Sequence, residues 1–341
     1  MIRNCVTRCI RCTQHCRIVA NSRKLSRSHQ HRSSASNVNI FDRVAKQAQK
    51  DRAFQREDAD VFDYIKAEVG ERLVDRMFDL TKECKITAEI GCGRGFITRH
   101  ELPDGIEQFY LCDSSEVALK QAEAAAKPEG YKITTIHMDE EAPKFDENSL
   151  DMVISNLSLH WVNDLPGCFR SIIKSLRPDG VFLASIFGGD TLFELRSALQ
   201  LAEIERKGGI SAHISPFTQV QDIGSLLNQA GFKMLTIDTD ELVIGYPSMF
   251  ELMYDLKGMA ENNASYTRPL HLSRDVMTAA SAIYNELYKV ENGVSATFQL
   301  IHLVGWKPGP NQPQPLQRGS QNASFADLGI LTQQNDDDTK K

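Results

Sequence analysis

The chain has 341 residues, which is enough for one large domain or two ordinary ones. Apolar residues make up 41% and charged residues 25%, as is typical of a globular protein, and no apolar run approaches the roughly 18 residues of a membrane-spanning helix. The net charge is −6, with 45 acidic residues, so a basic surface for nucleic acid is not expected.

The first 36 residues differ in composition from everything that follows. Eight Lys or Arg residues precede Asp42, which is the first acidic residue, and Ser is frequent among them. An Arg-rich and Ser-rich segment without acidic residues is typical of a mitochondrial transit peptide. We therefore predict a transit peptide over residues 1–36, and the alternative is a basic arm without a fixed fold.

The next part of the chain predicts helices and then an alternation of strands and helices. Residues 37–80 are polar, with apolar positions at helical spacing, and predict one or two helices ahead of the core. Five short runs rich in β-branched and aromatic residues then alternate with helical stretches: ITAEI, QFYLCD, KITTIHMD, LDMVISN and VFLASIF. This alternation predicts a parallel sheet with helices on both faces.

The pattern changes after Gly189. Thr191 and Glu194 have the spacing of a capping box and predict a helix start, and a Gly-Gly pair at Gly208 predicts its end. A second helix, a long strand (KMLTIDTDELVI), two helices of which the first begins at Ser248 with a capping box, and a last strand (ATFQLIHLVGW) follow. The residues after this strand are rich in Pro, Gln, Asn and Asp and predict a disordered tail.

A glycine-rich loop directly follows the first predicted strand. Gly91, Gly93 and Gly95 lack a β-carbon, so the backbone can approach a ligand at the carboxyl edge of a parallel sheet. Dinucleotide-binding folds place the third glycine one residue later. The shorter spacing favours S-adenosylmethionine, a ligand without phosphates, although three glycines alone are a weak signal.

Carboxylates end the next two predicted strands. Asp113 follows the glycines by about 20 residues, where a carboxylate can accept hydrogen bonds from both ribose hydroxyls. Asp139 ends the third strand and is predicted to accept from the adenine amine. His137 and Asp139 also form an H-x-D pair, as in iron oxygenases, but Asp139 has the cofactor task and His137 is more simply a core or edge histidine. We therefore assign no metal site.

The loops after the fourth and fifth strands are the candidates for chemistry. Asn156 is predicted to face the reactive end of the cofactor, together with His160, which can move protons near neutral pH. Trp161 either forms an aromatic wall for a cation or closes the pocket over the adenosine. Asp190 and Glu194 are available to hold a basic group of a substrate.

The motifs EIGCGRG, CD, MDEE and SNLSLHWVNDLP resemble the class I methyltransferases of the biotin-pathway malonyl-carrier type. Longer stretches, such as PDGVFLASIFGGDTLFELR and MFELMYDLKGMAE, resemble a family of mitochondrial complex I assembly factors with arginine-hydroxylase activity. The likeness extends from about residue 39 to residue 306. It implies an α/β, Rossmann-like class I methyltransferase fold, with a seven-stranded, mostly parallel sheet of order 3-2-1-4-5-7-6 and helices on both faces.

The resemblance also implies a site, partners and a location. It adds Glu89 and Glu140 to the residues expected to bind S-adenosylmethionine. It implies a protein of the mitochondrial matrix, peripheral on the inner membrane, that modifies an arginine on an iron–sulfur subunit of the peripheral arm of complex I, with a small adaptor assembly factor as a further partner. The expected organisation is a transit peptide (1–36), N-terminal helices (37–80), a methyltransferase-like domain with helical insertions (81–307) and a tail (308–341).

Three functions remain open at this point. The resemblance favours a protein-arginine hydroxylase, whereas the cofactor motifs favour a methyltransferase. The third is an assembly chaperone that binds S-adenosylmethionine only to stabilise its fold. The residues alone indicate no oxidant, because they contain no iron triad, haem ligand set or flavin motif that we can assign.

Overall fold

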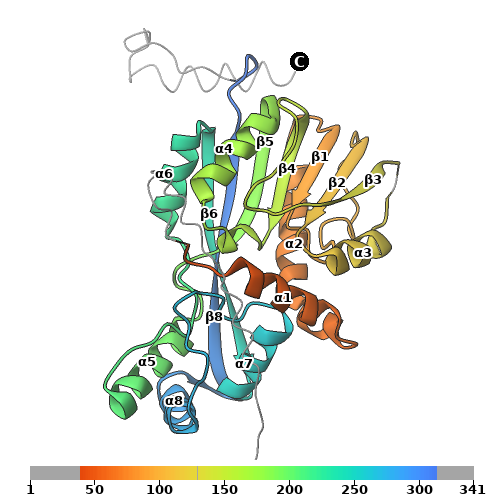
Figure 1. The fold of residues 1–341 in the computed structure, drawn as a ribbon. Coiled ribbons are helices and arrows are strands. Elements are labelled where there is room, and N and C mark those ends of the chain that lie inside the picture. The colour runs from red at the N-terminus through yellow and green to blue at the C-terminus, as the bar shows by residue number, and fades with distance from the viewer. Residues whose placement is uncertain (1–38, 129, 313–341) are drawn as a thin grey trace, which may run out of the picture. The chain divides into compact units, whose positions relative to one another are not determined.

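The computed structural model describes residues 39–128 and 130–312 (Figure 1). The predicted transit peptide and most of the predicted tail lie outside these residues. Within them, no helix has the length and apolar character needed to cross a membrane.

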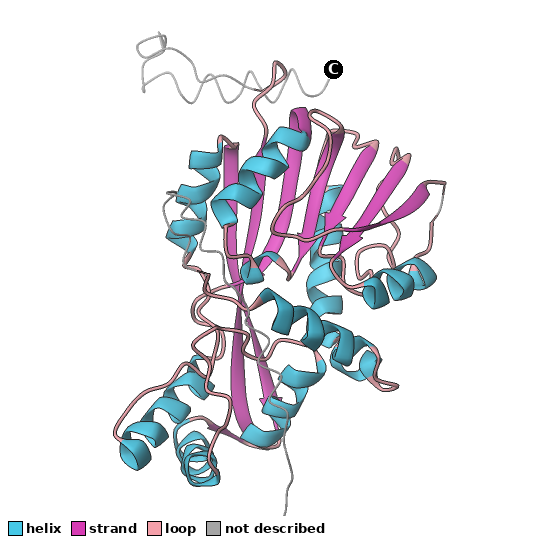
Figure 2. Cartoon of the chain, in the orientation of Figure 1, coloured by secondary structure: helices cyan, strands magenta, loops and turns pink. Residues whose placement is uncertain are grey.

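One mixed sheet organises the described residues (Figure 2). Its strand order is β3-β2-β1-β4-β5-β8-β6, in which the first five strands are parallel and β8 is antiparallel to both β5 and β6. The predicted order is therefore confirmed, with one added two-residue strand, β7, that pairs with β8. The strands are β1 (Ile86–Ile90), β2 (Gln108–Asp113), β3 (Lys132–His137), β4 (Leu150–Asn156), β5 (Leu176–Phe187), β6 (Lys233–Tyr246), β7 (Lys289–Val290) and β8 (Gly293–Trp306).

Helices cover both faces of the sheet, as the alternation of elements predicts. Alternate residues of a strand point to opposite faces. In β4, Met152 and Ile154 pack with α2 and α3 on one face, and Val153 packs with α4 and α6 on the other. These helices are α2 (Tyr64–Phe78), α3 (Glu116–Ala125), α4 (Leu165–Ser175) and α6 (Val220–Ala230).

A separate helical layer packs on the extended ends of β6 and β8. It consists of α5 (Phe193–Lys207), α7 (Met249–Gly258) and α8 (Arg274–Leu287), which share an apolar core with Phe298 and Leu300 of β8 (Figure 1). The first helix, α1 (Arg43–Phe54), lies across the edge where the parallel strands end, and a short 3-10 helix (Ala59–Phe62) joins it to α2. A second 3-10 helix, Leu159–Trp161, follows β4.

A helix follows each predicted capping box, but the cap at Thr191 is wrong and the cap at Ser248 is confirmed. Leu192, with a φ of 56°, precedes α5 in place of a side-chain cap. Glu194 is drawn inward instead, where its carboxylate accepts hydrogen bonds from the backbone N–H and the hydroxyl of Thr297 on β8. Glu194 therefore bonds to Thr297 of β8 and does not cap the first turn of α5. Ser248, by contrast, caps α7 by accepting from the N–H of Phe250.

Candidate functional site

The glycine loop after β1 has the backbone conformation that glycine favours. The φ angles of Gly91, Gly93 and Gly95 are 69°, 52° and 73°, all in the left-handed region. A β-carbon on Gly91 would lie 2.0 Å from Oγ of Ser158, whereas one on Gly93 would meet nothing closer than 3.7 Å. Gly91 therefore permits a close approach of two loops, and Gly93 leaves space beside the backbone.

This difference predicts unequal effects of alanine at the two glycines. Gly93→Ala should lower the free energy of unfolding by about 1–2 kcal/mol, from backbone strain alone. Gly91→Ala should cost about 3 kcal/mol or more, because the clash with Ser158 adds to the strain. Chemical denaturation measures both values. Ser158→Gly in the Gly91→Ala background should recover part of the loss, and equal losses at the two glycines would contradict the assignment.

Asp113 lies at the end of β2, completely buried, directly beside the glycine loop. Its carboxylate accepts hydrogen bonds from the backbone N–H groups of Gly93, at 3.0 Å, and Ser115, at 2.8 Å. The ammonium of Lys50 lies 3.3 Å from both of its oxygens. The predicted ribose-binding carboxylate is thus fixed beside the glycine loop and already faces a cation.

Two other predicted cofactor residues carry buried oxygens without partners. Glu89 is fully buried, and neither of its carboxylate oxygens has a hydrogen-bond partner among the described residues. Burial, with the nearby charge of Asp113, raises the pKa of Glu89 well above its ordinary value. Asn156 donates to the carbonyl of Lys66 at 2.9 Å, while its Oδ1 is buried and similarly unpartnered within the described ranges. Groups of this kind usually have a partner, so they fit a ligand with hydrogen-bond donors.

The structure places the two adjacent acidic residues after β3 in different environments. The side chain of Asp139 is 54% exposed and pairs with Arg43 at 2.6 Å. Glu140 is buried and pairs with both Arg43, at 2.6 Å, and Lys50. Burial alone would raise the pKa of Glu140, but Lys50 and Arg43 outweigh it and hold that pKa well below the ordinary value. Glu140, rather than Asp139, is the carboxylate of this segment that is buried next to Lys50 and Asp113.

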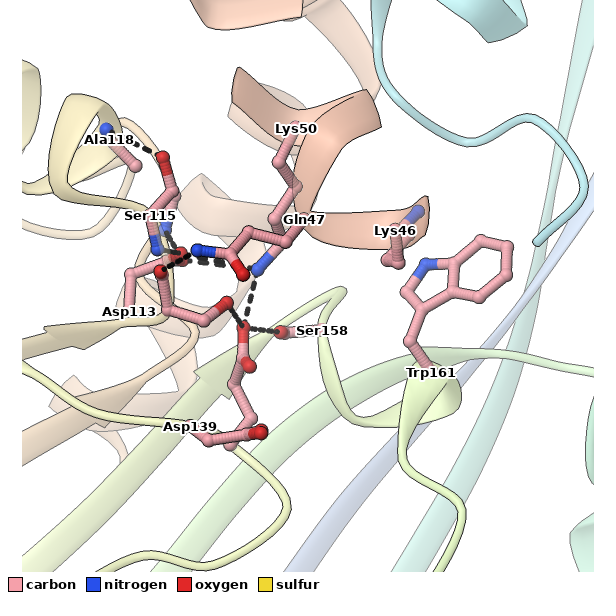
Figure 3. A network of polar contacts seen from close by, with 12 residues as sticks. Lys46, Gln47, Lys50, Asp113, Ser115, Ala118, Asp139, Ser158 and Trp161 are labelled. Atoms are coloured by element: carbon pink, nitrogen blue, oxygen red, sulfur yellow. Dashed lines mark hydrogen bonds and ion pairs between the residues drawn. The ribbon is translucent and has the colours of Figure 1, made fainter. Parts of the chain in front are cut away.

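Three basic side chains of α1 pair with buried acids of this region. Arg43, Lys46 and Lys50 are spaced three and four residues apart and therefore share one face of the helix. Figure 3 shows Lys50 reaching toward Asp113, and Lys46 beside the ring of Trp161. The sequence analysis missed these residues. Their spacing of three and four residues, in a segment with few apolar positions, could have indicated a helix with one basic face.

His160 and Trp161 meet a carboxylate that the sequence analysis also missed. Oε2 of Glu261 accepts from Nε1 of Trp161 at 2.9 Å and lies 3.2 Å from Nε2 of His160. Lys66 pairs with the same carboxylate at 3.0 Å, and Lys46 at 3.6 Å. All five side chains are buried, so these groups form one polar cluster beside the end of β4.

The charges of this cluster shift the acidity of its members. Burial alone would raise the pKa of Glu261, but Lys46 and Lys66 hold it well below the ordinary value. Burial lowers the pKa of His160, and this outweighs the opposing effect of Glu261. The imidazole is therefore neutral near pH 7, and its Nδ1 has no hydrogen-bond partner in the part of the chain that the structure describes.

The remaining predicted residues lie elsewhere. Asp190 is exposed on the loop after β5 and accepts from the amide of Gln299 at 3.1 Å. His137 contacts the carbonyl of Ser114 at 2.9 Å. Among residues 39–128 and 130–312, no group of three His, Cys, Asp or Glu side chains is placed to hold a metal ion.

A cavity of about 370 Å³ adjoins the polar cluster. Glu261, Gln49 and Asn263 form part of its polar wall, and Phe217 and Leu195 belong to its apolar wall. It lies between α5, α7 and the loop that follows α7. Glu261 therefore belongs both to the polar cluster and to the wall of this cavity.

Comparisons with known proteins agree with this geometry. Residues 88–184 match the family model of the methyltransferase domain. The protein named arginine-hydroxylase NDUFAF5, mitochondrial, of Danio rerio is 46% identical over 314 residues, which are 92% of this chain and 97% of that protein. A malonyl-[acyl-carrier protein] O-methyltransferase of Xylella fastidiosa is 33% identical over 178 residues, which are 52% of this chain and 58% of the relative.

A solved structure supports the fold alone. A provisionally named methyltransferase from Bacillus halodurans superposes with a TM-score of 0.51 at 16% identity, and the match covers 70% of this chain and 98% of that one. Together with the domain match, this confirms the predicted class I methyltransferase fold.

Proposed function

Since the chain belongs to the family of the mitochondrial arginine-hydroxylase NDUFAF5, we propose that it hydroxylates an arginine side chain of a protein substrate. The observation that carries the proposal is the 46% identity to a relative of that name over 97% of its length. The family likeness also supports a role in early assembly of complex I, with an iron–sulfur subunit of its peripheral arm as the substrate. The place of action would be the mitochondrial matrix, at the inner membrane, with an adaptor assembly factor as a further partner.

S-adenosylmethionine is the proposed cofactor, bound at the carboxyl ends of β1, β2 and β4. The methyltransferase domain supports this, as do the unpartnered oxygens of Glu89 and Asn156. Asp113 would hold the ribose hydroxyls, and Glu140 is better buried than Asp139 for a contact with the adenine. Since Lys50 already contacts Asp113 and Glu140, it must share these carboxylates or move when the cofactor binds. When bound, this cofactor would supply an electrophilic methyl group, which suits methyl transfer; hydroxylation would take its oxygen atom from an external oxidant and any electrons it needs from an external donor.

The residues around the reacting centre would bind and orient the substrate. Neutral His160 can accept a proton, and Glu261 holds its ring in place. The aromatic walls formed by Trp161 and Phe217 exclude water from the same region. Arginine side chains are protonated below about pH 12, so a carboxylate such as Glu261 suits their recognition.

The mass of the substrate subunit tests the proposal. The iron–sulfur subunits of complex I should be isolated from cells that lack this chain and from the same cells after its return, and their arginine peptides compared by mass spectrometry. Return of the chain should add one oxygen atom to one arginine. An added methylene, or restored assembly with an unchanged subunit mass, would contradict the hydroxylase.

A methyltransferase is the second candidate function. The methyltransferase domain match and the Xylella fastidiosa relative favour it. Methyl transfer needs little beyond an aligned nucleophile, a dry pocket and a route for one proton. Incubation with radiolabelled S-adenosylmethionine and mitochondrial extract tests it, because a methyltransferase labels an acceptor and a hydroxylase does not.

A further inference from the structure

A lysine of the chain occupies a site whose chemistry is suited to a cation. The ammonium of Lys46 lies 3.4 Å from the ring centroid of Trp161 and 3.6 Å from Oε2 of Glu261, and it donates a hydrogen bond to the carbonyl of Ala260. An aromatic face, a carboxylate and a carbonyl oxygen together form a cage that attracts positive charge. We refer to Trp161, Glu261 and the Ala260 carbonyl as the cation cage.

The ammonium is a poor occupant of this cage. Lys46 is 1% exposed, and burial lowers its pKa well below the ordinary value, to which the charges of Lys66, Lys50 and Arg43 add. An ammonium is strongly hydrated and loses its water here, whereas a guanidinium is weakly hydrated, keeps its charge and stacks flat on an indole ring. The cage therefore suits a guanidinium better than the lysine that fills it.

The surroundings of the cage supply further acceptors and a way in. Glu261 lies on the wall of the 370 Å³ cavity, and so does Gln49. The amide nitrogen of Gln49 donates to the carbonyl of Asn263 at 3.2 Å, which fixes the orientation of the side chain. Its Oε1 is buried and has no hydrogen-bond partner within residues 39–128 and 130–312. A guanidinium has five N–H donors and can use such an oxygen together with the cage.

We propose that the cation cage binds the guanidinium of the substrate arginine, and that Lys46 fills the cage until the substrate displaces it. The site rests on the proposed function for the identity of its ligand. Exchange of one cation for another leaves Glu261 paired throughout. Lys66 meanwhile remains on the other oxygen of Glu261.

Tryptophan fluorescence tests the proposal without any turnover. The chain has two tryptophans, so a Trp306→Phe background leaves Trp161 as the only reporter. N-ethylguanidinium is titrated into this protein and into its Lys46→Met variant. Removing the internal competitor should lower the apparent Kd for the probe by about tenfold or more, because the free cage is then always available. N-ethylurea, which has a similar shape and no charge, should not bind.

Two further variants control the comparison. Arg52→Met removes the same charge from the same helix at an exposed position that does not touch the cage, so its affinity for the probe should equal that of the background protein. Glu261→Gln added to Lys46→Met should abolish binding. If that protein does not fold, the comparison of Lys46→Met with Arg52→Met alone decides. Equal affinity in these two variants, or equal binding of the urea, overturns the proposal.

The outcome is separable from that of the proposed function. Tight guanidinium binding by Lys46→Met, with no oxygen added to the subunit, would support the cage and reject the hydroxylase. Oxygen addition in cells, with no effect of Lys46→Met on probe binding, would support the hydroxylase and reject the cage.

Discussion

Asp113→Asn should weaken the binding of S-adenosylmethionine by about 100-fold or more. The carboxylate accepts two backbone hydrogen bonds, from Gly93 and Ser115. We propose that its remaining lone pairs accept hydrogen bonds from the ribose hydroxyls. An asparagine keeps the shape but loses the charge and places N–H groups toward donors. Loss of charge-assisted hydrogen bonds costs about 1.5–3 kcal/mol each, and about 3 kcal/mol in total corresponds to 100-fold in Kd. Isothermal titration calorimetry measures the change.

Two matched acidic variants accompany this measurement. Asp139→Asn should change the affinity less than about threefold, because an exposed ion pair contributes little. Glu140→Gln should weaken binding clearly, since that carboxylate is buried and shares Lys50 with Asp113. Wild-type affinity in Asp113→Asn would remove the basis for the proposed cofactor site. A large loss of affinity in Asp139→Asn, with no loss in Glu140→Gln, would instead indicate that Asp139 contacts the adenine.

Glu261→Gln should lower the free energy of unfolding by about 3–5 kcal/mol. The substitution leaves Lys66 and Lys46 buried without their counter-ion, and breaking a buried ion pair on one side has a cost of this size. Urea denaturation at pH 7 measures it. Addition of Lys46→Met should recover part of the loss, because one of the uncompensated ammonium groups is then removed. Glu141→Gln, which breaks a partly exposed pair with Arg43 at 3.7 Å, should cost less than about 1 kcal/mol.

The difference in the free energy of unfolding between wild type and Glu261→Gln should depend on pH in a predictable direction. The folded-state pKa of Glu261 is held below the ordinary value of 4.5. The ionised carboxylate of Glu261 therefore makes its full contribution to the free energy of unfolding above about pH 4.5. This contribution is lost as the pH falls through the folded-state pKa. The stability difference between wild type and Glu261→Gln should narrow below pH 4.5 and stay constant above it. A difference that widens on acidification would contradict the charge state assigned to Glu261.

Local sequence patterns predicted the sheet well and the polar cluster poorly. The strand order and the glycine loop follow from signals within a few residues, such as β-branched runs and glycines after a strand. Glu261 is 100 residues from Trp161 in sequence, and only the packing of the loop after α7 brings the two together. The residue pattern within a single helix or strand cannot predict a contact of this kind.

The capping box at Thr191 failed for a related reason. The hydroxyl of Thr191 donates to the carbonyl of Gln299, and Glu194 accepts from Thr297, so both side chains bond across to β8. Local capping and tertiary hydrogen bonding compete for the same oxygens. In this protein the buried hydrogen bonds to β8 form instead of the local cap. They can be predicted only when the position of β8 in the sheet is known.

The helix α1 also determines how far this protein can be shortened. The segment that matches the methyltransferase domain spans residues 88–184, yet the cations opposite Asp113 and Glu140 come from residues 43 and 50. An excised fragment that begins at β1 would contain these buried acids with nothing to neutralise them. We therefore expect that the segment 88–184 does not fold independently, and that a shortened version or chimera must retain the chain from about residue 40 onward.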